Sequence, residues 1–200
     1  IYRMTSLIVS EILLLAAAYS SWKALYMSKP WVWHRVLALL ALVSVMTGGP
    51  AAWLAGEGLM GSAALASLAS VLLWLALNQW KPMPLVGLLS STLAAVFILP
   101  LFVLTPNEVA QAEPLAALTL AHIVFAVLAF AAFTLAAMQS VAVVWLSLQL
   151  KQHRLSQYPG AGALEYNEQV WLWLARLAWL LVGVALLTGI PAVDDVFSQH

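Results

Sequence analysis

Cysteine is absent from the 200-residue sequence. Its absence excludes disulfides, iron–sulfur clusters, thiolate-bound zinc and a covalent c-type haem site, which needs Cys-x-x-Cys-His. Any metal or haem would have to be held by His, Met or carboxylate side chains. Charge is also scarce, because only 8% of the residues are charged and eight basic residues balance eight acidic ones. This balance gives no indication of nucleic-acid binding.

The motifs of soluble enzymes are absent as well. The sequence contains no phosphate-binding glycine-rich loop, no His-Glu-x-x-His and no nucleophile elbow. Gly160-Ala-Gly162 fits only a flexible loop between two apolar runs. The sequence therefore predicts a protein that is not an enzyme.

Apolar residues make up 64% of the chain, and the mean hydropathy is +0.96. A soluble domain is about half apolar and about a quarter charged. The charged residues divide the chain into six long apolar runs, at about 4–26, 36–54, 59–77, 85–104, 115–150 and 170–193. None alternates like a barrel strand, so helices are the only plausible spanning structures. The prediction is an all-α, polytopic transmembrane bundle of about six helices in a single domain, 1–200. The first residue is Ile, which is compatible with a fragment of a longer protein.

The loops between the runs predict an orientation. Six of the eight basic residues lie in alternate loops: Lys23, Lys29, Arg35, Lys81, Lys151 and Arg154. The other loops hold acidic residues and no Lys or Arg: Glu57, Glu108, Glu113, Asp194 and Asp195. The positive-inside rule makes the basic side cytoplasmic and places both termini on the outer side.

The run 115–150 is long for a membrane span. As one helix it would reach about 54 Å, whereas the hydrocarbon core is about 30 Å thick. Polar residues near its end, such as Gln139 and Gln149, predict that the C-terminal part projects into water. Eight of the ten tryptophans lie near predicted cytoplasmic ends and are expected to form an interfacial belt: Trp22, Trp31, Trp33, Trp74, Trp80, Trp145, Trp171 and Trp173.

Three ionisable residues fall inside the predicted spans, where charge is costly and each is a candidate for function. His122 lies about two turns from the outer end of its run, on a face with Ala126 and Ala129. Neutral imidazole binds haem iron well, and small neighbours leave room for a flat ring. The alternative is a histidine hydrogen-bonded to a neighbouring helix. Glu11 could be protonated, pair across the bundle or relay protons, and Arg176 could snorkel to the headgroups or pair with an anionic group.

The other histidines lie in loops or at the end of the chain. His34 and His153 are expected to be solvated surface residues. His200 is predicted on the outer side, like the outer end of the run that carries His122. A cofactor-binding pair of His122 and His200 is therefore geometrically conceivable.

Several short segments follow one another in a recognisable order. They are Pro106-Asn107-Glu108, Leu120-Ala-His122-Ile123, Ala129 to Gln139, Leu148 to Lys151, Glu168 at the start of the last helix, and Leu187-Thr-Gly189 at its end. In this order and spacing the stretch from Thr105 to Ile190 resembles the cytochrome c assembly membrane protein family, which includes CcsA-, HemX- and YpjD-type proteins. The pattern is most similar to the YpjD branch. Relatives continue beyond the point at which this sequence ends.

The resemblance implies a multi-pass protein of the bacterial inner membrane. It implies haem bound non-covalently near the outer face, with His122 as the axial ligand of the metal, and partners among cytochrome maturation or other membrane proteins. The tryptophan-rich external segment ending in Trp-x-Trp-Asp is absent, and Trp31-Val-Trp33-His34 lies on the predicted cytoplasmic side. The absence of this tryptophan-rich segment favours another function, that of a non-catalytic scaffold or regulator similar to HemX-type members. A small-solute transporter is a further alternative function, because Gly48-Gly49-Pro50 and Pro100 could break helices.

Overall fold

The part of the chain that the structure describes is mostly helical. The computed structural model describes residues 2–27, 32–47, 58–80, 83–98 and 117–198. Within these ranges there are six α-helices and no strand: α1 (Tyr2–Leu25), α2 (Trp33–Thr47), α4 (Gly58–Leu77), α5 (Pro84–Ile98), α6 (Ala117–Lys151) and α7 (Leu164–Ser198). The all-α prediction is confirmed, and each apolar run corresponds to one helix. The predicted helical segments 48–54 and 99–104 lie outside the described residues.

The last helix begins earlier than the hydropathy predicts. α7 starts at Leu164 instead of residue 170, so its first turns are polar. The Asn167 amide nitrogen donates to the carbonyl oxygens of Ala161 at 3.3 Å and Ala163 at 2.8 Å. These bonds tie the start of α7 to the preceding turn. Hydropathy locates the apolar part of a helix, whereas hydrogen bonds of this kind decide where the helix begins.

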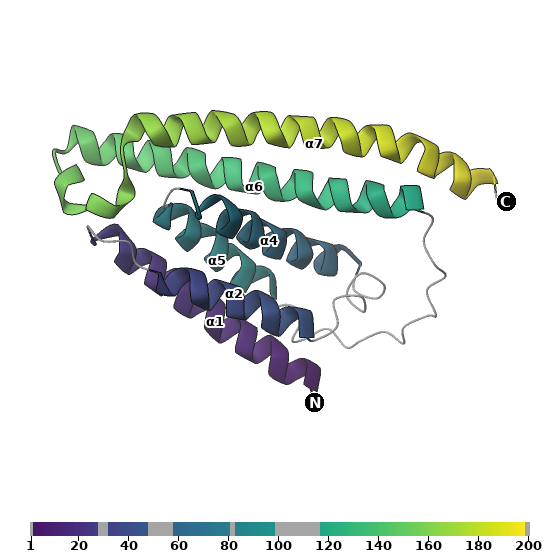
Figure 1. The fold of residues 1–200 in the computed structure, drawn as a ribbon, viewed down its shortest axis with the longest axis horizontal. Helices are drawn as coiled ribbons and strands as arrows, with labels where there is room; N and C mark the ends of the chain where they lie inside the picture. Colours follow the sequence, from purple (N-terminus) through teal and green to yellow (C-terminus); the bar gives the residue numbers. More distant parts are fainter. Residues whose placement is uncertain (1, 28–31, 48–57, 81–82, 99–116, 199–200) are drawn as a thin grey trace.

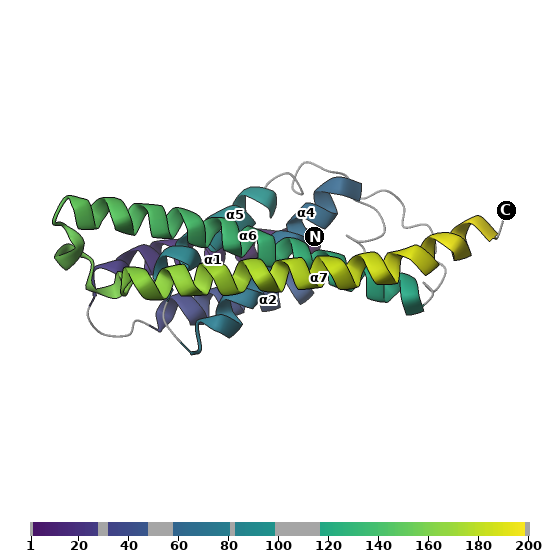
Figure 2. The same cartoon turned by 90° about the horizontal axis from the view of Figure 1, so that it is seen from above.

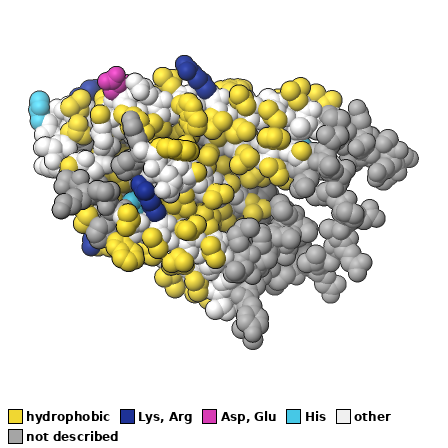
Figure 3. All heavy atoms as spheres, viewed as in Figure 1, with side chains coloured by type: hydrophobic (Ala, Val, Ile, Leu, Met, Phe, Trp, Pro, Cys, Tyr) yellow, Lys and Arg dark blue, Asp and Glu magenta, His cyan; other side chains and the backbone are white. Residues whose placement is uncertain are grey.

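Three of the described helices are long and apolar enough to cross a membrane. These are Thr5–Leu25, Ala121–Lys151 and Pro159–Ile190, with 21, 31 and 32 residues. The apolar stretches of α2, α4 and α5 are shorter. Figure 3 shows a largely apolar surface over the described residues, with its few charged side chains in one half of the molecule. Length, composition and surface together are those of a membrane protein.

α6 and α7 form a long antiparallel hairpin that lies along the remaining helices (Figures 1 and 2). Two hydrogen-bonded pairs set the register of this hairpin. The Gln139 amide nitrogen donates to the backbone and side-chain oxygens of Asn167 at 3.0 and 2.9 Å, and His122 bonds to Ala185 further along. Gln139 is fully buried, which corrects the expectation that this residue marks a segment projecting into water. We call the end of the bundle at which residues 152–163 join α6 to α7 the connection end.

Several helix ends meet at the connection end. Leu25 of α1, Leu146 of α6 and Ala161 form one buried cluster. Gly160 lies so close to the carbonyl oxygen of Ala24 that no side chain would fit there. The C-terminal part of α6 is therefore packed against the end of α1 up to Leu146, and only its last residues extend further.

An aromatic cluster covers the same end. The ring of Tyr158 lies 5.2 Å from that of Tyr26 and 4.9 Å from that of Trp145, measured between centroids. Loss of hydration and the neighbouring Tyr158 hydroxyl raise the pKa of Tyr26 above its ordinary value.

Trp74 is the largest fully buried side chain among the described residues. Its indole faces Gly87 of α5, where an added Cβ would overlap the ring. Trp74 is therefore a core residue, and its expected place in an interfacial belt is wrong. Trp22, Trp33, Trp80 and Trp173 are exposed, as belt residues would be.

Candidate functional site

His122 lies on the side of α6 that faces α7. Its Nδ1 atom is 2.8 Å from the carbonyl oxygen of Ala185. A carbonyl oxygen can only accept a hydrogen bond, so Nδ1 carries the proton and, in the neutral ring, Nε2 carries the lone pair. Among the described residues Nε2 has no hydrogen-bond partner. The contact between helices thus orients the imidazole and leaves its second nitrogen able to bind a metal.

The imidazole fits against α7 because Gly189 has no side chain. A Cβ at Gly189 would lie 2.8 Å from both Cε1 and Nδ1 of His122. Real Cβ atoms essentially never approach a neighbour so closely. Ala185, the hydrogen-bond acceptor, is one helical turn away and is also small. Two small residues of α7 therefore form the surface on which the ring of His122 lies.

Gly189→Ala is expected to destabilise the protein by about 1–3 kcal/mol, the usual cost of overpacking. The ring of His122 must turn away from the new methyl group, and its bond to Ala185 is then lost. Gly183→Ala is the matched control, because a Cβ at Gly183 has no heavy atom within 4 Å. The measurement is the free energy of unfolding in mixed micelles. Equal values for the two variants would contradict the contact.

The structure does not bring the other ionisable candidates to His122. Arg176 is exposed on α7 and precedes Ala185 by nine residues, which is about 14 Å along the helix. Glu11 is half-buried on α1, and its Oε2 atom is shielded from solvent without a hydrogen-bond partner in the described structure. α1 packs against α2 and α5, whereas α6 packs chiefly against α7 and α4.

His200 lies outside the described residues. α7 continues from Gly189 to Ser198, about 14 Å along the helix. Within the described ranges no group of three or more His, Asp or Glu side chains could hold a metal ion. Of the predicted pair, the structure therefore describes His122 alone.

His34 is buried, whereas the sequence predicted a solvated position at the surface. It is only 3% exposed, and its ring lies 5.6 Å from the ring of Trp74. Its Nε2 atom is 3.3 Å from the amide nitrogen of Asn78, which is also fully buried. The only sequence signal is the spacing of four residues between Trp74 and Asn78, which puts Asn78, in the turn directly after α4, on the side of the helix that carries Trp74. His153, in contrast, is exposed as expected.

Comparisons with protein-family models, with curated proteins and with solved structures find no match to this chain. The arguments for its function therefore rest on its own residues and on the resemblance of its sequence pattern.

Proposed function

We propose that this protein is a multi-pass protein of the bacterial inner membrane that binds haem non-covalently near the outer face, with His122 as the axial ligand. Its role is to hold, transport or present haem for cytochrome c assembly, without chemistry of its own. The observation that carries the proposal is the hydrogen bond from Nδ1 of His122 to Ala185. Metal-binding histidines commonly donate their second ring N–H to a carbonyl or carboxylate, which sets the tautomer and the ring orientation.

The sequence resemblance adds a second argument. Leu120–Ile123 and Leu187–Gly189 are separate pieces of the family pattern, 64 residues apart or more. In the fold they lie together, because His122 packs directly on Gly189. This contact brings two distant pieces of the pattern to one place, which supports the proposal that they form a site.

The residues at the site have separate tasks. Nε2 of His122 would donate the lone pair, the Ala185 carbonyl would keep the proton on Nδ1, and Gly189 would leave room for the ring. Haem, if bound, would supply the iron that accepts this lone pair. Arg176 is about 14 Å from Ala185 along α7, so it would lie at a different depth in the membrane, and it is not assigned to this haem.

The membrane orientation is part of the proposal. Lys23, Arg35, Lys151 and Arg154 belong to helix ends or turns that meet at the connection end. We assign this end to the cytoplasm by the positive-inside rule. All six helices would then span, with both termini and His122 toward the outer side.

The test is a haem titration of the purified full chain in detergent, followed by its visible absorption spectrum. One haem per chain with a Soret band shifted from that of free haem supports the proposal. A protein that stays colourless and takes up no added haem overturns it.

That negative outcome would favour a non-catalytic scaffold or regulator. On its solvent-exposed side, α7 carries several large apolar side chains, among them Trp179, Leu187 and Ile190. Such a face suits contact with lipid or with the helices of a partner protein.

A further inference from the structure

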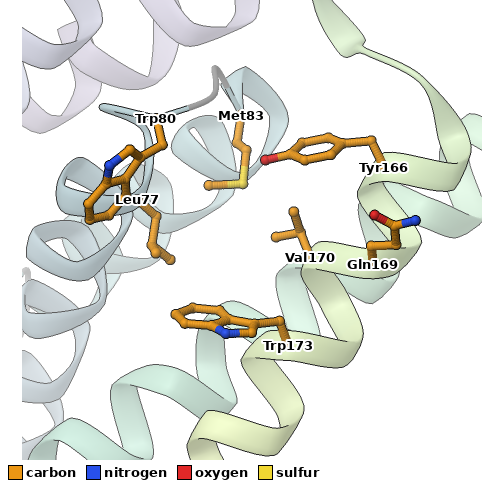
Figure 4. A pocket seen from close by; sticks show the side chains of 7 residues that line it. All are labelled: Leu77, Trp80, Met83, Tyr166, Gln169, Val170 and Trp173. Carbon is orange, nitrogen blue, oxygen red and sulfur yellow. The ribbon is translucent and has the colours of Figure 1, made fainter.

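A groove of about 440 Å³ lies between the end of α4 and the first turns of α7. Figure 4 shows Trp80 and Leu77 on one side and Val170 on the other, with the Tyr166 hydroxyl pointing toward the Met83 sulfur at the top. Its volume is within the range of small-molecule sites, about 300–1,000 Å³. Trp173, which also lines it, precedes Ala185 by about 18 Å along α7. The groove is therefore separate from His122.

The α4 side of the groove is held in place by buried hydrogen bonds. The indole nitrogen of Trp74 donates to the carbonyl oxygen of Met83 at 3.0 Å, and the Met83 N–H donates to Oδ1 of Asn78 at 2.7 Å. Oδ1 of Asn78 accepts the hydrogen bond from the Met83 N–H, so the nitrogen of the same side-chain amide is the atom that donates to Nε2 of His34. Both backbone groups of Met83 are thus fixed by buried side chains. This wall is preformed, as the walls of ligand sites usually are.

The chemistry of the described lining residues selects the ligand. None of them carries a formal charge, and placing a charged group in such surroundings is costly. The only polar side-chain atoms of the described lining are the two indole nitrogens, the Gln169 amide and the Tyr166 hydroxyl, which are all uncharged. The aromatic rings and the thioether favour flat or chain-like apolar groups. An uncharged ligand with a largely apolar body and a small polar end matches all of these features.

We infer that this groove binds an uncharged membrane amphiphile with a small polar end and an apolar chain. Lipoquinones and diacylglycerols share this chemistry. The groove is open along the side of α7 that faces α4, so that an amphiphile can enter it from outside the bundle. The inference does not depend on haem binding, because no residue of the groove belongs to the His122 site.

The experiment uses the purified full chain in detergent and native mass spectrometry. Decylubiquinone and dioleoylglycerol are titrated separately, with dodecyl phosphate as a charged comparison. Retention of one molecule of either neutral probe per chain supports the inference, and the probe retained at the lower concentration identifies the source. Retention of neither neutral probe overturns it, and so does retention of dodecyl phosphate at equal or lower concentration.

A matched pair of tryptophan variants locates the binding. Trp173→Ala removes a side chain that lines the groove and is expected to weaken binding of the retained probe about tenfold, which is about 1.4 kcal/mol. Trp171→Ala removes a partly exposed tryptophan of the same helix that does not line the groove, and binding should stay within about twofold of the unmodified chain. Val170→Phe fills the groove and should weaken binding as well. Unchanged binding in both Trp173→Ala and Val170→Phe would place the probe elsewhere and overturn the inference.

Discussion

The His122→Ala variant is expected to lose the Soret absorption of the haem-loaded protein, with haem affinity lower by at least about 100-fold. Changing a residue that merely orients a metal ligand costs about 10–100-fold, so removal of the ligand should cost no less. Nε2 of His122 is the nitrogen left free by the bond to Ala185, and the other described histidines, His34 and His153, lie near the connection end. The measurement is a haem titration followed in the Soret region, with the unmodified chain alongside.

His153→Ala is the matched control for this prediction. His153 is exposed in the turn after α6, so its loss should leave both haem affinity and spectrum unchanged. His122→Ala should still fold, because it loses one hydrogen bond worth about 0.5–1.5 kcal/mol. Circular dichroism of each variant checks this. If His122→Ala takes up haem as tightly as the unmodified chain, His122 is not the ligand.

The helices could be predicted from sequence because membrane spans depend on a local property, the apolar length between charges. α4 begins and ends within about one residue of the predicted run 59–77. The place of His122 facing another helix was also foreseen as an alternative, since an imidazole in a span needs a polar partner. Its acceptor, the Ala185 carbonyl, could not be foreseen, because a backbone group leaves no mark in the side-chain pattern.

The burial of His34 and Trp74 could not be predicted for a related reason. Both lie near predicted helix ends, where tryptophan and histidine are usually at the interface. Their burial depends on contacts between α2, α4 and the turn that begins α5, through Asn78 and Met83. His34 and Asn78, for example, are 44 positions apart in the sequence. Hydropathy along the chain carries no information about such pairs.

The largest expected effect on stability belongs to Gly87. An added Cβ there would overlap the indole of Trp74, which is fully buried and hydrogen-bonded to Met83. The ring cannot withdraw without breaking that bond or displacing its neighbours in the core. Gly87→Val is therefore expected to lower the free energy of unfolding by at least about 3 kcal/mol, the upper part of the usual range for overpacking. The measurement is unfolding in mixed micelles, and a loss below about 0.5 kcal/mol would contradict the close contact.

A double-mutant cycle separates this overlap from a general intolerance of valine in α5. Trp74→Leu alone should destabilise the protein, because it leaves a cavity and removes the indole hydrogen bond to the Met83 carbonyl oxygen, which keeps only its bond from the Gly87 N–H. In Trp74→Leu, however, the space that the introduced valine side chain would need is vacated. Gly87→Val and Trp74→Leu together should therefore cost clearly less than the sum of their separate effects, with a coupling of about 1–3 kcal/mol. Simple additivity would mean that Gly87 is required for a reason other than Trp74.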